Sequence, residues 1–155
     1  MCQRLYIASY SALPPVRKTK QAPYLSVKHV PEGNAAVRAH FPAEYRYLQV
    51  AEGHAPCGCG FPEEATKGKG GPLKTTPEDR LTMARLVEHL RPVVRGRPRV
   101  QLLLCFEGDE AEPSDAGPIL ALRSLSDPSF RFRNSERVTV VRGGGVEQGD
   151  EADEA

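Results

Sequence analysis

The sequence lacks the long apolar segment that a membrane span requires. No apolar run in its 155 residues approaches the ~20 residues that cross a bilayer as a helix. The first residues offer only a short apolar stretch before Pro14 and Pro15, which argues against a secretory signal peptide. We therefore expect a cytoplasmic protein with no membrane partner.

The sequence also has few cysteines, and they are unevenly spaced. The four are Cys2, Cys57, Cys59 and Cys105. Thiols stay reduced in the cytoplasm, so we expect free thiols or metal ligands rather than disulfides.

Several familiar motifs are missing. The run at residues 67–71 (Lys-Gly-Lys-Gly-Gly) lacks the Gly-Lys-Ser/Thr ending of a phosphate loop, and no serine carries a nucleophile-elbow motif. Aromatic residues are not interleaved with the clustered arginines, which are Arg91, Arg95, Arg97 and Arg99. Base stacking is therefore unsupported, and nucleic acid is not an expected partner.

Composition and charge divide the chain into two parts. Gly and Pro each occur 14 times, which indicates long loops. Residues 143–155 hold five of the 20 acidic residues and none of the 21 basic ones, so residues 1–142 carry a net charge of +6. We predict one domain over residues 1–142 and a disordered acidic tail over residues 143–155.

Alternating and continuous apolar patterns predict a sheet. Alternation or β-rich composition indicates strands over 4–9, 24–30, 45–50, 130–133 and 136–142, the last two joined by a tight turn at Asn134-Ser135. Residues 99–106 are almost entirely apolar, which is typical of a strand covered on both faces in the middle of a sheet. Residues 111–118 read as a loop, and 119–125 as either strand or helix.

The clearest helix covers residues 77–94. Thr76 is a suitable N-cap, and Pro77 suits the first helical position because its missing N–H has no intrahelical partner there. Apolar residues recur every three or four positions, as one buried stripe requires. A shorter helix is expected over 35–41. The sequence thus predicts an α+β fold: a mixed, largely antiparallel sheet with one main amphipathic helix packed on a face, and long loops.

The four cysteines can converge in such a fold. Cys2 precedes the first strand, Cys57 and Cys59 follow the third, and Cys105 lies near the end of the central strand. If the first strand is antiparallel to the central one, and the third points the same way as the central one, all four reach one edge of the sheet.

Four thiolates are the usual ligand set of structural zinc and of iron–sulfur clusters. We therefore expect a metal- or cluster-binding site formed by Cys2, Cys57, Cys59 and Cys105, with His54 as a substitute ligand. Gly58 and Gly60 fit this site because glycine lets the backbone turn tightly between the side chains.

A thiol enzyme is an alternative. Met1-Cys2 resembles the Met-Cys start of class II glutamine amidotransferases, over those two residues; the Gly-Ile that normally follows is Gln3-Arg4 here. The resemblance implies that Cys2, exposed after removal of Met1, acts as a nucleophile with its own amine as base. Cys57, paired with Cys59, is a second candidate nucleophile.

Two further features stay open. Acidic residues follow the central strand, where they could bind a divalent ion or act as acid and base beside the thiols, or form a solvated turn: Glu107, Asp109, Glu110, Glu112 and Asp115. The basic face and the Gly/Lys run are compatible with a non-catalytic binding module for an anionic partner.

Overall fold

The computed structural model describes residues 3–17, 25–31, 34–53, 60–64, 76–95, 99–106 and 108–142. Its strands are β1 (Gln3–Ser9), β2 (Ser26–His29), β3 (Tyr47–Glu52), β4 (Val100–Phe106), β5 (Asp115–Ala121) and β6 (Glu136–Val141). Its helices are α1 (Ala35–Arg38), α2 (Pro77–Val94) and the short 3-10 helix η1 (Leu122–Ser126). The predicted tail, residues 143–155, lies outside the described residues.

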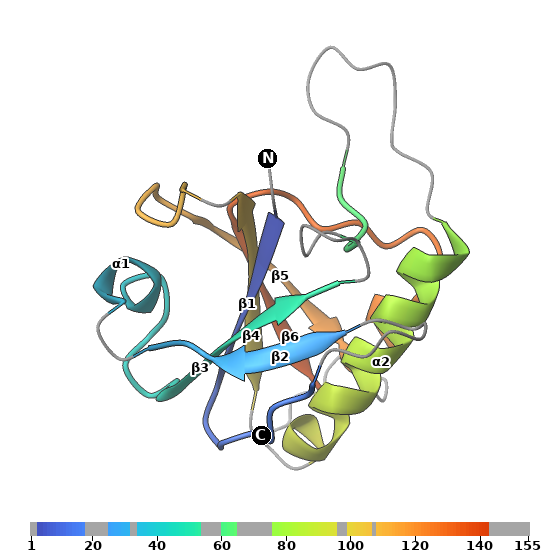
Figure 1. Cartoon of the computed structure of the whole chain (residues 1–155), viewed down its shortest axis with the longest axis horizontal. Coiled ribbons are helices and arrows are strands. Elements are labelled where there is room, and N and C mark those ends of the chain that lie inside the picture. The colour runs from blue at the N-terminus through green and yellow to red at the C-terminus, as the bar shows by residue number, and fades with distance from the viewer. Residues whose placement is uncertain are drawn as a thin grey trace.

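These strands form one sheet in the order β2-β3-β1-β4-β6-β5 (Figure 1). All neighbours are antiparallel except β5 and β6, which are parallel. The predicted α+β fold, with a mixed and largely antiparallel sheet and one main helix, is therefore confirmed. β4 lies inside the sheet, and Leu102, Leu103 and Leu104 are buried on its two faces, as its continuous apolar run predicted.

The two faces of the sheet are covered unequally. Leu5 and Ile7 of β1 belong to the larger apolar cluster, which includes the buried stripe of α2. Tyr6 and Ala8 point to the other face and pack in a smaller cluster with Val37 of α1. Figure 1 shows α2 and α1 on opposite sides of the sheet. The alternation of β1 thus decides which residues face which helix.

α2 has the bounds that the sequence predicted, because its start is specified by side chains. The Thr76 hydroxyl accepts a hydrogen bond from the Asp79 amide, and the Asp79 carboxylate accepts one from the Thr76 amide, each 3.1 Å long. This reciprocal pair is a capping box. Pro92 lies in the last turn without ending the helix, since the Arg95 amide still donates to the Arg91 carbonyl.

The prediction of a loop over residues 111–118 is wrong at its end, because β5 starts at Asp115. β5 is a largely exposed edge strand, so burial imposes no apolar alternation on it. Its pairing with β6 shifts register between Ala116 and Ile119. Gly117 lies in this shift, where a Cβ atom would stand 2.6 Å from the Arg137 carbonyl oxygen. The ambiguous residues 119–125 divide between β5 and η1.

The predicted strand at 130–133 and its hairpin with the last strand are also wrong. Phe132 forms an isolated parallel bridge with Glu63 instead. Phe132 is buried between two rings, with centroids 6.3 Å from Phe61 and 4.9 Å from Phe130. The aromatic residues that suggested a strand therefore fill the core under α2, and β6 pairs with β4 and β5.

The two edge strands, β2 and β5, each have a feature that limits further backbone pairing. At the β2 edge, Val16 and Val27 exchange two backbone hydrogen bonds of 2.8 and 2.9 Å. At the other edge, Pro118 of β5 has no amide hydrogen to donate.

In the part of the chain that the structure describes, no helix is both long and apolar enough to cross a bilayer.

Candidate functional site

One edge of the sheet, formed by the ends of its strands rather than by an outer strand, carries residues that flank the predicted cysteine site. β1 begins at this edge, and β3 and β4 end there because both are antiparallel to β1. Arg4 is paired with Cys105 of β4, and its guanidinium forms a 3.7 Å ion pair with Glu52 at the end of β3. The two strand directions required by the sequence prediction are therefore confirmed.

Residues 60–64, which come directly after the cysteine pair in the chain, also contact the start of β1. The Gln3 side-chain amide donates a hydrogen bond to the Glu63 carboxylate. The backbone of Pro62 and Glu64 is held by two hydrogen bonds to Phe132. Gly60 has a φ of 125°, a conformation that favours glycine. Both flanks of the cysteine stretch are thus attached to the consecutive residues Gln3 and Arg4.

Most of the predicted ligands cannot be placed. Cys2, His54, Cys57 and Cys59 lie outside the described residues. Cys105 is described, and it is buried at 2% exposure in the smaller apolar cluster with Tyr6 and Leu103. Burial and the nearby Glu110 and Asp109 carboxylates raise the pKa of the Cys105 thiol to about 12. In this surrounding the thiol is neutral and is not an activated nucleophile.

Glu110, one of the acidic residues that follow β4, contacts β1 close to the predicted thiol edge. Its carboxylate accepts hydrogen bonds of 2.9 Å from the Tyr6 hydroxyl and from the Gly108 amide. Burial acts to raise the pKa of Glu110, but hydrogen bonds from backbone amides and from Tyr6 outweigh it and hold the pKa below its ordinary value. A carboxylate that stays ionised therefore lies beside the Cys105 thiol.

The rest of the acidic cluster is spread out. Glu107 lies outside the described residues, and Asp115 begins β5. Glu112 lines a pocket that is also lined by His40. Among the residues that the structure describes, no group of three or more His, Cys, Asp or Glu side chains could hold a metal ion. The described carboxylates therefore form no cation site by themselves.

A hydrogen-bond network around His40 was not predicted. Its Nδ1 atom is 2.9 Å from the Ser114 hydroxyl, and its Nε2 atom contacts the Glu110 carbonyl oxygen. Arg137 of β6 donates to the His40 carbonyl at 3.0 Å. His40, Ser114 and Arg137 line an open pocket of about 400 Å³. Pattern reading could not find this network, because His40 and Ser114 are 74 residues apart.

No known protein family, curated protein or solved structure matches this chain. Its function must therefore be argued from its own residues.

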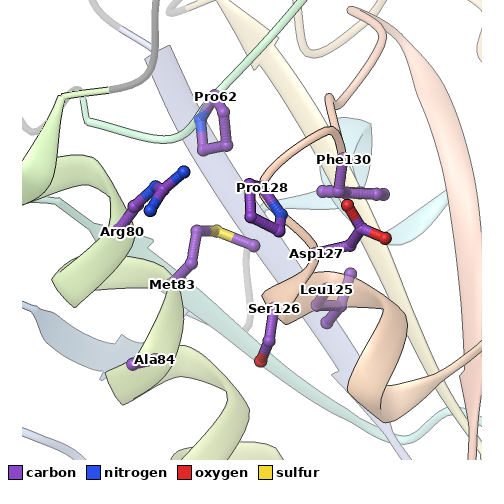
Figure 2. Close-up of a pocket in the computed structure, with 9 residues that line it drawn as sticks. All are labelled: Pro62, Arg80, Met83, Ala84, Leu125, Ser126, Asp127, Pro128 and Phe130. Carbon is purple, nitrogen blue, oxygen red and sulfur yellow. The ribbon is translucent and has the colours of Figure 1, made fainter.

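A small apolar pocket lies between α2 and the segment after β5. Figure 2 shows Met83 reaching from α2 toward the segment that carries Leu125 and Pro128, with Phe130 on the far side. The volume is about 120 Å³, well below the ~300 Å³ at which small-molecule sites begin. This pocket is a gap in the packing of α2 rather than a ligand site.

Proposed function

We propose that this protein binds a thiolate-coordinated zinc ion or iron–sulfur cluster at the edge where β1 begins. The ligands are Cys2, Cys57, Cys59 and Cys105, and His54 replaces Cys105 if that thiol stays in the core. The protein acts in the cytoplasm, where the thiols remain reduced.

The observation that carries the proposal is the pair of contacts around Gln3 and Arg4. Glu52 and Glu63, on either side of the cysteine stretch, bind to these two neighbouring residues. An extended chain spans about 3.5 Å per residue, so Cys59 is within ~14 Å of Glu63 and Cys57 within ~18 Å of Glu52. Cys2 directly precedes Gln3 in the sequence. The chain therefore leaves all four thiols within reach of one another.

The electrostatics around Cys105 favour a cation over a free thiolate. Glu110 and Asp109 raise the thiol pKa because a thiolate would be a third negative charge nearby. The same carboxylates attract a metal ion, and a metal ion lowers the pKa of a coordinating thiol until it deprotonates. This arrangement supports a ligand role for Cys105 and argues against its use as a nucleophile.

The test is the metal content of freshly purified protein, measured by elemental analysis together with the visible spectrum. We expect about one zinc per chain, or the brown colour of a cluster, and we expect Cys57→Ser/Cys59→Ser to lose it. Ser11→Ala, a one-atom change on an exposed loop, is the control and should keep the metal. Retention of metal in Cys105→Ala and its loss in Cys105→Ala/His54→Ala would assign His54 as the fourth ligand.

Two results would overturn the proposal. One is a native protein that contains no metal, has no colour and reacts at all four thiols with a thiol reagent, and that still does so after anaerobic incubation with the metal or cluster components. The other is a Cys57→Ser/Cys59→Ser variant with the metal content of the parent.

A further inference from the structure

A pocket rimmed by arginine lies at the carboxyl end of α2, on the face that packs against η1. Its volume is about 340 Å³, within the range of small-molecule sites. The buried side chains of Val87, Val94 and Leu122 line its interior. Four exposed arginines from three separate parts of the fold surround them: Arg91 of α2 and Arg95 directly after it, Arg123 of η1, and Arg142, which follows β6.

The described residues around this pocket do not balance its positive charge. Among the described residues, no acidic side chain lines the pocket, and none of the four guanidinium groups forms an ion pair. Arg142 donates one hydrogen bond of 3.1 Å, to the Arg95 carbonyl. Guanidinium charges around one pocket repel one another, and an anion bound among them would offset this repulsion.

Helix electrostatics account for only part of this cluster. The negative end of the α2 dipole favours Arg91 in its last turn and Arg95 directly after it. Arg123 and Arg142 come from other elements, so their position at the same pocket has no such cause. The dipole opposes an anion here, but it amounts to about half a charge against four guanidinium charges. The net field of these described residues therefore attracts anions.

We propose that this pocket binds a small phosphate ester with an attached ring, of the mononucleotide class. A phosphate offers three strong acceptor oxygens and nearly two negative charges, so it can satisfy more guanidinium groups than a single carboxylate can. The apolar interior suits a planar ring, which also stacks on a guanidinium. A nucleic-acid strand fits less well, because the described residues that line the pocket include no aromatic side chain to stack successive bases.

The test is calorimetric titration with adenosine monophosphate, adenosine and inorganic phosphate in separate experiments. We expect the monophosphate to bind more tightly than either part, because only the whole molecule uses both the guanidinium rim and the apolar interior. Arg91→Gln and Arg123→Gln should each weaken binding at least ~10-fold, as expected for loss of a hydrogen bond to a charged group. Arg85→Gln is the matched control: it is exposed on the same helix outside the pocket and should change the affinity less than ~2-fold.

Equal binding by Arg91→Gln, Arg123→Gln and the parent would overturn the proposal. So would tight binding of a single-stranded RNA 20-mer with no binding of the monophosphate, since that would assign the surface to nucleic acid. Absence of any binding by adenosine monophosphate at millimolar concentration would also reject it. None of these variants touches a cysteine, so the outcome is independent of the proposed metal site.

Discussion

The hydrogen bond between Tyr6 and Glu110 links the centre of the sheet to the turn after β4. Tyr6 is 4% exposed, and its hydroxyl donates to the Glu110 carboxylate at 2.9 Å. Burial, followed by this hydrogen bond, raises the pKa of Tyr6. The same hydrogen bond is one of the interactions that lower the pKa of Glu110. This hydrogen bond therefore favours the state in which Tyr6 is protonated and Glu110 is ionised.

Tyr6→Phe removes this hydrogen bond and should lower the free energy of unfolding by about 1–2 kcal/mol at pH 7. The folded pKa of Glu110 lies below its unfolded value of about 4.3, so its contribution is present above that value and is lost as the pH falls through the folded pKa. The effect of the substitution should therefore shrink below about pH 4. Urea denaturation at pH 7 and pH 3 measures it.

Tyr47→Phe is the control for this measurement, because Tyr47 is 41% exposed. It should change stability by less than ~0.5 kcal/mol at either pH. An equal loss at both pH values in Tyr6→Phe would contradict the assigned link to Glu110.

At this scale the sequence predicts residue types better than residue partners. The apolar run around Cys105 indicated that it is buried, and the acidic residues after it indicated nearby negative charge. The Tyr6–Glu110 contact joins residues 104 positions apart, and no local pattern encodes such a pairing. The same holds for His40, whose partners come from the loop before β5 and from β6.

Among the elements, α2 was predictable and β5 was not, for opposite physical reasons. α2 has a capping box and one buried stripe, so its own residues specify both where it starts and which face packs on the sheet. β5 is exposed, interrupted by Gly117-Pro118, and exists because β6 pairs with it. Its signal therefore lies in the partner strand rather than in its own residues.

The stripe of α2 should dominate the stability of the helix face. Leu86 is fully buried, whereas Leu81 on the same helix is 44% exposed. Leu86→Ala removes buried apolar volume and should reduce the free energy of unfolding by about 2–5 kcal/mol. Leu81→Ala should change it by less than ~0.5 kcal/mol, because the helix propensities are similar and little burial is lost. Urea denaturation midpoints of the two variants provide the comparison, and equal losses would refute the packing assignment.

For the whole molecule, the sequence predicted the fold class but not the order of the strands, and the directions of β1, β3 and β4 entered only as the condition for the cysteines to converge. Order depends on contacts between segments far apart in the chain, such as β1 with β4. The convergence of strand ends was a geometric consequence of direction alone. The attachment of residues 60–64 to Gln3 was not predictable, since it depends on Phe61 and Phe132 packing together.

The proposed metal site predicts how the whole molecule responds to chelation. A metal that binds the folded state only stabilises it by mass action, and here it would join three distant segments. Removing the metal with a strong chelator and a thiol reductant should lower the melting temperature by several degrees, at about 2–4 °C per kcal/mol for a chain of this size. Scanning calorimetry measures the shift.

Cys57→Ser/Cys59→Ser should melt at the same temperature with and without chelator. If the parent also melts unchanged while elemental analysis confirms that metal has been removed, the metal does not hold the fold together.

Both lateral borders of the sheet are protected, and this bears on self-association. Val16 occupies hydrogen-bonding groups of Val27 along β2, and the β5–β6 pairing shifts register at Gly117-Pro118, where Pro118 has no amide hydrogen. A foreign strand that aligned with either border would meet donors and acceptors already used, displaced or missing. Although Ile119 is 61% exposed on β5, the native chain therefore presents a poor template for fibril growth, and such growth would first require the border to unfold.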